Sequence, residues 1–273
     1  MSAVRGSVEL AEVARRIVYG SSLADKLAPA PASRTTDRDP GPVERAVAPG
    51  RPADLAIVAR APHVPRAAGM ADPAQRARIL HAVANHELQA VELFAWALLA
   101  FPGAPAEFRR GVARILGEEQ SHVRAYAARL DELGMAFGEL PVSAYFWGKI
   151  GAVATPAQFV CAMGLTFENA NLDHTLAYAA AARRAGDPRT AKVFEQVHAD
   201  EVTHVGFAAA WLKKLAPGAA SLWDAYVANL QGALLPGQGR TPAGAGDAGR
   251  HAAGLDPDFV QHLVRSPRRR SEP

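Results

Sequence analysis

Two segments of the chain each carry a glutamate followed three residues later by a histidine. One copy is Glu119 and His122, and the other is Glu201 and His204. A helix turns about 300° over three residues, so the two side chains of each copy lie on one face, one turn apart. A carboxylate and an imidazole in this arrangement can bind the same metal ion. The repeated motif therefore predicts metal binding.

The two motifs belong to an internal repeat. Glu87 lies 32 residues before Glu119, and Glu168 lies 33 residues before Glu201. Two similar helical hairpins, related by an approximate two-fold axis, would direct these side chains toward one another. We therefore predict a buried centre of two metal ions with six ligands: Glu87, Glu119, His122, Glu168, Glu201 and His204.

Glu92 is the alternative to Glu87 as the ligand from the first helix, because apolar residues flank it as well. The matching spacings of the repeat favour Glu87, and the choice stays open at this point. Glu118 and Asp200 are turned by about 100° from the ligand faces, so we expect them to face solvent or to hydrogen-bond a ligand.

Charge and ligand type indicate which metal this centre would hold. Four buried carboxylates repel one another and are costly to desolvate, whereas two divalent ions balance their charge. Carboxylates and imidazoles without a thiolate suit iron or manganese better than a structural zinc site. We expect two iron ions, with manganese as the second choice. A metal-free, salt-bridged network of the same residues is the alternative.

Prolines near plausible helix caps mark where four long helices begin. Short turns join the first two helices and the last two, while residues 134–154 form a longer link. This connectivity predicts an all-α, ferritin-like antiparallel four-helix bundle with one long crossover. The expected helices run from 73 to about 101, from 105 to 133, from 156 to 185 and from 188 to 215.

The ends of the chain differ from this central part. We expect an N-terminal helix and a Pro-rich arm in residues 1–72 and the bundle in 73–216. Residues 217–273 should contain a short helix at 220–233 and then, from residue 235, a flexible basic tail. The arm is either packed or disordered. The tail carries four arginines: Arg265, Arg268, Arg269 and Arg270.

Composition limits the class of protein. The chain has 273 residues, 49% of them hydrophobic, and 30 Lys and Arg residues against 27 Asp and Glu residues. A single cysteine, Cys161, excludes an internal disulfide and any Cys-x-x-Cys motif. No stretch has the roughly 18 uncharged apolar residues of a membrane span, and the first residues lack a secretory pattern. We expect a cytoplasmic protein without membrane contact.

Three strings resemble a bacterial ferritin-like family known as domain of unknown function 455. They are His86-Glu87-Leu88-Gln89-Ala90-Val91-Glu92-Leu93, Glu118-Glu119-Gln120-Ser121-His122 and Phe167-Glu168-Asn169-Ala170-Asn171-Leu172-Asp173. The resemblance covers most of the chain, including Pro49-Gly50-Arg51-Pro52. It implies the ferritin-like fold and a di-metal centre, and it implies no particular reaction.

The leading functional hypothesis is an oxidoreductase or hydroxylase that activates O2 or peroxide at this centre. Its substrate is an unknown small molecule or a tRNA, and a homodimer is compatible with the sequence. Two alternatives come from other classes: an iron-handling ferroxidase, and a metal-free helical interaction domain. The number of subunits and the metal content distinguish the three.

Overall fold

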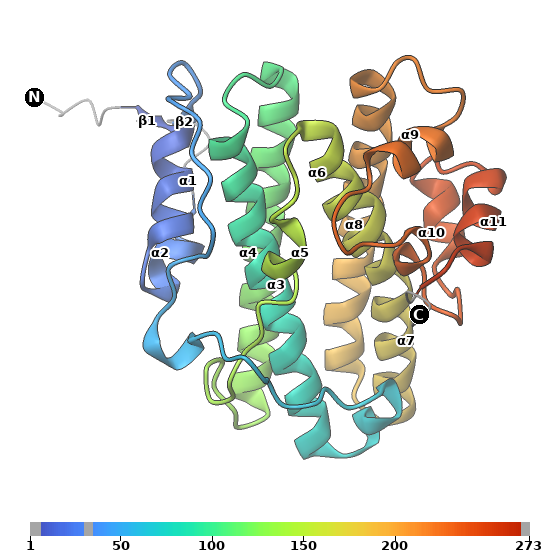
Figure 1. Cartoon of the computed structure of the whole chain (residues 1–273). Coiled ribbons are helices and arrows are strands. Elements are labelled where there is room, and N and C mark those ends of the chain that lie inside the picture. The colour runs from blue at the N-terminus through green and yellow to red at the C-terminus, as the bar shows by residue number, and fades with distance from the viewer. Residues whose placement is uncertain (1–6, 30–34, 269–273) are drawn as a thin grey trace, which may run out of the picture. The chain divides into compact units, whose positions relative to one another are not determined.

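The computed structural model describes residues 7–29 and 35–268, and helices dominate this part of the chain (Figure 1). Its strands are two residues long each, with β1 (Val8–Glu9) paired in parallel with β2 (Thr35–Thr36). The all-α class is therefore confirmed. Arg269 and Arg270 of the predicted basic tail lie outside the described residues.

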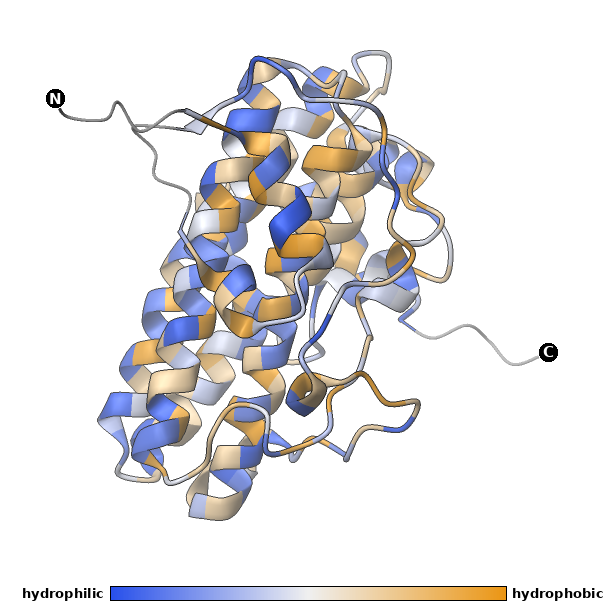
Figure 2. Ribbon diagram, turned by 90° about the vertical axis from the view of Figure 1, so that its left-hand side faces the viewer, coloured by the Kyte–Doolittle hydropathy of each residue, from blue (hydrophilic) through white to orange (hydrophobic). Residues whose placement is uncertain are grey.

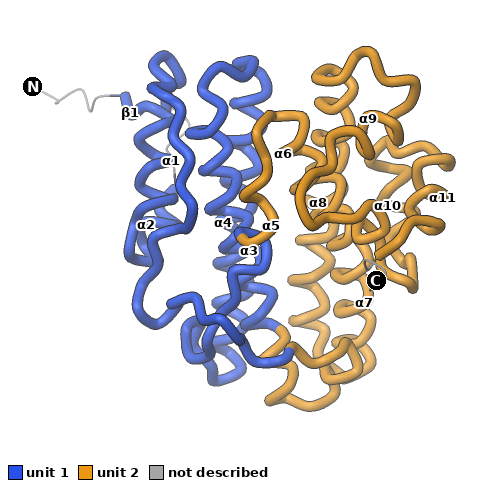
Figure 3. The backbone as a smooth tube through the Cα atoms, viewed as in Figure 1, with its two compact units in different colours: residues 1–63, 80–147 blue, residues 64–79, 148–273 orange. Residues whose placement is uncertain are grey.

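The chain divides into two compact units (Figure 3). Unit 1 comprises residues 1–63 and 80–147, and unit 2 comprises residues 64–79 and 148–273. The helices carry both hydrophobic and hydrophilic residues (Figure 2). The division predicted from the sequence, with boundaries at 72 and 216, stays a prediction.

The two long helices of unit 1 form an antiparallel hairpin. α3 (Pro73–Ala100), of which residues 80–100 belong to this unit, is followed after a short turn by α4 (Ala106–Glu132). The guanidinium of Arg109, near the start of α4, donates to the Leu98 carbonyl near the end of α3 at 2.7 Å. From Glu87 to the end of α3 every residue is buried, so a carboxylate in this stretch has to be neutralised inside the protein.

The N-terminal helix and the Pro-rich arm belong to unit 1 as far as residue 63. They contain α1 (Leu10–Tyr19), α2 (Leu23–Leu27) and the short η1 (Ala53–Leu55), joined by irregular chain. Trp96 on α3 donates through Nε1 to the Ala46 carbonyl at 3.1 Å. The sequence left open whether the arm is packed or disordered. Of its described residues, Leu55 is buried and Ala46 contacts α3, while most of the others are partly or fully exposed.

Unit 2 contains a second antiparallel hairpin. The Asp187 side chain accepts a hydrogen bond from the Thr190 amide at 2.9 Å and caps the returning helix, as its sequence predicts. Arg183 and Glu195, on opposite sides of the turn, form an ion pair at 2.6 Å. The outgoing side consists of α6 (Pro156–Ala162), η3 (Met163–Glu168) and α7 (Asn169–Arg184), and the returning side is α8 (Pro188–Leu215).

The C-terminal segment of unit 2 folds back onto α7. The sequence predicted a flexible tail beyond residue 235, whereas the described residues up to 268 include short helices with buried side chains. The reason is Arg250, which is fully buried and binds Asp173 of α7 at 2.8 Å. The helices of this segment are α9 (Leu222–Asn229), η4 (Pro236–Gly239), α10 (Asp247–Ala252) and α11 (Pro257–Arg265).

Two short helices complete the described chain: η2 (Ala67–Ala71), before α3, and α5 (Trp147–Ile150), in the long link. None of the helices formed by the described residues combines the length and the apolar character needed to cross a lipid bilayer.

Candidate metal centre

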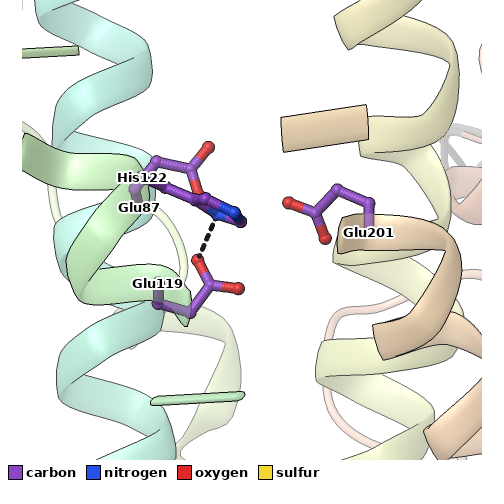
Figure 4. Close-up of side chains that lie close together, drawn as sticks. All are labelled: Glu87, Glu119, His122 and Glu201. Carbon is purple, nitrogen blue, oxygen red and sulfur yellow. Dashed lines mark ion pairs between the residues drawn. The ribbon is translucent and has the colours of Figure 1, made fainter. Parts of the chain in front are cut away.

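In unit 1, three of the predicted ligands lie against one another (Figure 4). Nδ1 of His122 is 3.4 Å from a carboxylate oxygen of Glu119 and 3.5 Å from one of Glu87. One ligand atom from each of these residues lies within 4.8 Å of the others. Glu87 comes from α3, and the Glu-x-x-His of α4 supplies the other two. We refer to these residues as the unit 1 triad.

The direction of the α4 ligands follows from the helix period. Glu119 and His122 are three residues apart and lie on the buried face, as predicted. Glu118, turned away by about 100°, forms an ion pair with Arg114 at 2.7 Å, and both side chains are partly exposed. The two adjacent glutamates therefore differ in environment, and only Glu119 is placed to bind a buried ion.

Unit 2 repeats the arrangement with Glu168, Glu201 and His204, which we refer to as the unit 2 triad. Nδ1 of His204 is 3.2 Å from a carboxylate oxygen of Glu201. One ligand atom of each member again lies within 4.8 Å of the others. Asn171, one turn after Glu168, donates through Nδ2 to Glu201 at 2.9 Å. All six residues of the two triads are at most 4% exposed.

Glu168 is presented by a π-turn that sequence reasoning missed. The pattern predicted one continuous helix from 156 to 185, but η3 interrupts it between Met163 and Glu168. In a π-turn the backbone amide bonds the carbonyl five residues back, which adds about one residue to the turn. Nothing in the residue types of this segment marks the change.

Glu92, the alternative ligand, has a different role. Its carboxylate lies 3.0 Å from Nζ of Lys26, 2.7 Å from Nε of Arg51 and 2.9 Å from Nε1 of Trp147. Two buried cations already balance its charge, and burial lowers the pKa of Lys26 in spite of the attraction of Glu92. Glu87, beside His122, is the ligand candidate of α3.

Asp173 matches Glu92 in the second hairpin, because Glu92 lies five residues after Glu87 and Asp173 lies five residues after Glu168. Burial acts to raise the pKa of Asp173, but the hydrogen bonds and charge of Arg250 and two backbone amides outweigh it and hold the pKa below its usual value. The carboxylate accepts from Arg250 at 2.8 and 3.0 Å. This acid also serves the structure and is not available to a metal.

Three further side chains lie close to triad residues in the sequence. His198 shares a 3.0 Å hydrogen bond with Thr175. Tyr126, one turn past His122, is fully buried. Burial raises the pKa of the Cys161 thiol, so the thiol stays protonated and is a poor metal ligand.

The donor atoms of the triads fit a hard or borderline divalent cation. Each triad offers two carboxylates and one imidazole, and an ion of charge +2 balances the two carboxylates. The chain is thus a helical protein with buried carboxylate and histidine clusters that could hold metal ions.

Comparison with known families identifies the group to which this helical protein belongs. The family described as Protein of unknown function (DUF455) matches residues 11–261, a range that contains both triads, and the chain belongs to this family. The family inferred from the sequence is therefore confirmed, and its ferritin-like fold stays a prediction. Comparisons with curated proteins and with solved structures gave no match.

Proposed function

We propose that the two triads together bind two metal ions and that the protein is a di-metal carboxylate oxidoreductase. In this proposal the hairpins of the two units associate as a ferritin-like antiparallel four-helix bundle. Six ligands then surround the ions: Glu87, Glu119, His122, Glu168, Glu201 and His204.

One observation carries the proposal: the same buried triad occurs twice, once in each hairpin. Both triads combine a glutamate from the first helix of a hairpin with a Glu-x-x-His from the second. When all four buried carboxylates are ionised they carry a total charge of −4, which two divalent ions would cancel.

The residues of the chain have distinct tasks in this scheme. The carboxylates hold and charge-balance the ions, and the amide of Asn171 fixes the direction of the Glu201 carboxylate at 2.9 Å. The surrounding buried side chains exclude bulk water. A pair of redox-active ions would supply the binding and reduction of O2 or peroxide. Iron suits this chemistry and the ligand set, and manganese is the second choice.

Metal analysis of the anaerobically loaded protein tests the proposal. We expect about two iron ions per chain and a ferric absorption band that appears on exposure to O2. Glu119→Gln should lower the metal content, whereas Glu118→Gln, at the adjacent partly exposed position paired with Arg114, should leave it unchanged. Wild-type protein that binds no metal, or equal metal content in both variants, would refute the proposal.

The same samples separate oxidoreductase chemistry from iron storage. A storage protein oxidises and retains many iron ions per chain inside a closed shell of subunits. We expect instead that iron uptake stops at about two ions per chain and that the protein elutes as a small species. Continued uptake in a large assembly would favour the iron-handling alternative.

A further inference from the structure

The π-turn η3 determines the direction in which Glu168 points. Because a π-turn contains about one residue more than an α-helical turn, it changes the direction of every later side chain by about 100°. After it, Asn171 and Thr175 lie on the same face as Glu168, three and seven residues further on. Both contact α8, through Glu201 at 2.9 Å and His198 at 3.0 Å. The turn therefore aligns Glu168 with the face of α7 that contacts α8.

A threonine within the turn bonds across it. The Thr166 hydroxyl donates to the Cys161 carbonyl, five residues earlier, at 2.8 Å. The same oxygen lies 2.8 Å from the hydroxyl of Tyr226, which α9 supplies. Both side chains are almost completely buried, so this pair of hydrogen bonds is protected from competition with water. The hydroxyls of Thr166 and Tyr226 together hold the turn at its middle.

The C-terminal segment and α8 also enclose the turn. A Cβ atom on Gly164 would lie 2.2 Å from Cβ of Ala208 on α8, so only glycine allows this approach. A Cβ atom on Gly239 of η4 would lie 2.7 Å from the Leu165 carbonyl. Arg250 donates to the carbonyl of Asn169, directly after the turn, at 2.9 Å. An α-helical repacking of this segment would disrupt these contacts.

The geometry points to Thr166 and Tyr226 as positioning residues for Glu168: the C-terminal segment locks the π-turn so that this carboxylate faces the metal centre. The inference rests on the proposed function, because it assigns Glu168 as a ligand. It gives the C-terminal segment a role in metal binding even though that segment contributes no ligand.

Variants that remove one hydroxyl each test the inference. Thr166→Val and Tyr226→Phe keep the size of the side chain, and Thr166→Ser restores the hydroxyl. Tyr178→Phe, at a largely buried tyrosine on α7 ten residues beyond Glu168, is the matched control. Titration with Co(II) alone reports stoichiometry and affinity, and the Co(II) absorption spectrum reports the ligand environment. Amide hydrogen exchange of residues 163–168 in the metal-free protein reports on the turn itself.

We expect Thr166→Val and Tyr226→Phe to lose about 10- to 100-fold in affinity for one of two Co(II) ions. Their spectra should change, and exchange of 163–168 should accelerate. Thr166→Ser and Tyr178→Phe should behave as wild type. Should Thr166→Val fail to fold, Tyr226→Phe carries the test alone.

The outcomes separate this inference from the proposed function. Wild-type affinity and spectrum in both hydroxyl variants, while the wild type binds two ions, would overturn the inference and leave the metal centre standing. Faster exchange of residues 163–168 with unchanged Co(II) binding would also overturn the inference alone, since the turn would then not position a ligand. Wild-type protein that binds no Co(II) would overturn both.

Discussion

Glu119→Gln should stabilise the metal-free protein and destabilise the metal-loaded one relative to wild type. The substitution keeps the shape of the side chain and removes the negative charge that Glu119 brings to the unit 1 triad when it is ionised. Ligand oxygens of Glu87 and Glu119 lie within 4.8 Å of each other. Two unit charges at that distance repel by about 3.5 kcal/mol at an effective dielectric constant of about 20.

The expected gain is smaller than this repulsion, because His122 lies 3.4 and 3.5 Å from the two carboxylates and attracts them when protonated. We expect the free energy of unfolding of the metal-free protein to rise by about 1–3 kcal/mol. Metal has the opposite effect. At a free concentration 100 times the dissociation constant, one bound ion stabilises wild type by about 2.7 kcal/mol, and Glu119→Gln should lose most of that gain.

Urea unfolding, monitored by circular dichroism, measures the stability of the metal-free protein when a chelator is present and of the metal-loaded protein when Mn(II) is present. Mn(II) avoids the air oxidation that complicates iron. Glu118→Gln serves as the control, and its partly exposed pair with Arg114 should change stability by no more than about 0.5 kcal/mol under either condition. A Glu119→Gln variant that is less stable than wild type without metal, and equally stabilised by Mn(II), would refute the reasoning.

Three further outcomes follow from buried groups outside the triads. Arg250→Met leaves Asp173 without its guanidinium and should lower the free energy of unfolding by about 3–5 kcal/mol in urea titrations; a loss below about 1 kcal/mol would contradict the assigned pairing. Glu92→Gln should destabilise the protein yet keep its metal content by elemental analysis, whereas loss of an ion would make this residue a ligand. Burial lowers the pKa of His81, whose Nε2 accepts from the Gly138 amide at 3.0 Å. The unfolded chain then binds more protons than the folded protein below pH 6.5. Wild type should therefore lose stability relative to His81→Gln between about pH 7 and 5. Equal losses in both proteins would exclude protonation of His81 as a cause of the pH dependence.

The features that the sequence predicted well depend on local geometry. Pro73, Pro156 and Pro188 are the first residues of α3, α6 and α8, because proline fits the first helical position. Pro105 lies one residue earlier, as the cap of α4. The Glu-x-x-His spacing likewise places both ligands on one helix face whatever surrounds the helix. The assembly of both triads into one centre is not local, and it stays a proposal.

The features that the sequence did not reveal depend on contacts between distant segments. Lys26 and Arg250 look like ordinary surface cations in the sequence, yet both are fully buried. Their partners lie 66 and 77 residues away, at Glu92 and Asp173. The π-turn is similar, because the contacts that enclose it come from α8, α9 and η4. No periodicity within a single helix encodes such pairings.

The buried acids of each hairpin separate into two kinds according to their partners. Glu92 and Asp173 are held by ammonium or guanidinium groups, which offer only hydrogen-bond donors when protonated and so do not coordinate a cation. Glu119 and Glu201 instead lie against imidazoles, which can give up a proton and coordinate the same ion as the carboxylate. The N-terminal arm and the C-terminal segment supply the permanent cations at matching positions of the two hairpins. The triad acids therefore have partners that suit a metal. Glu92 and Asp173, five residues after Glu87 and Glu168, have partners that exclude one.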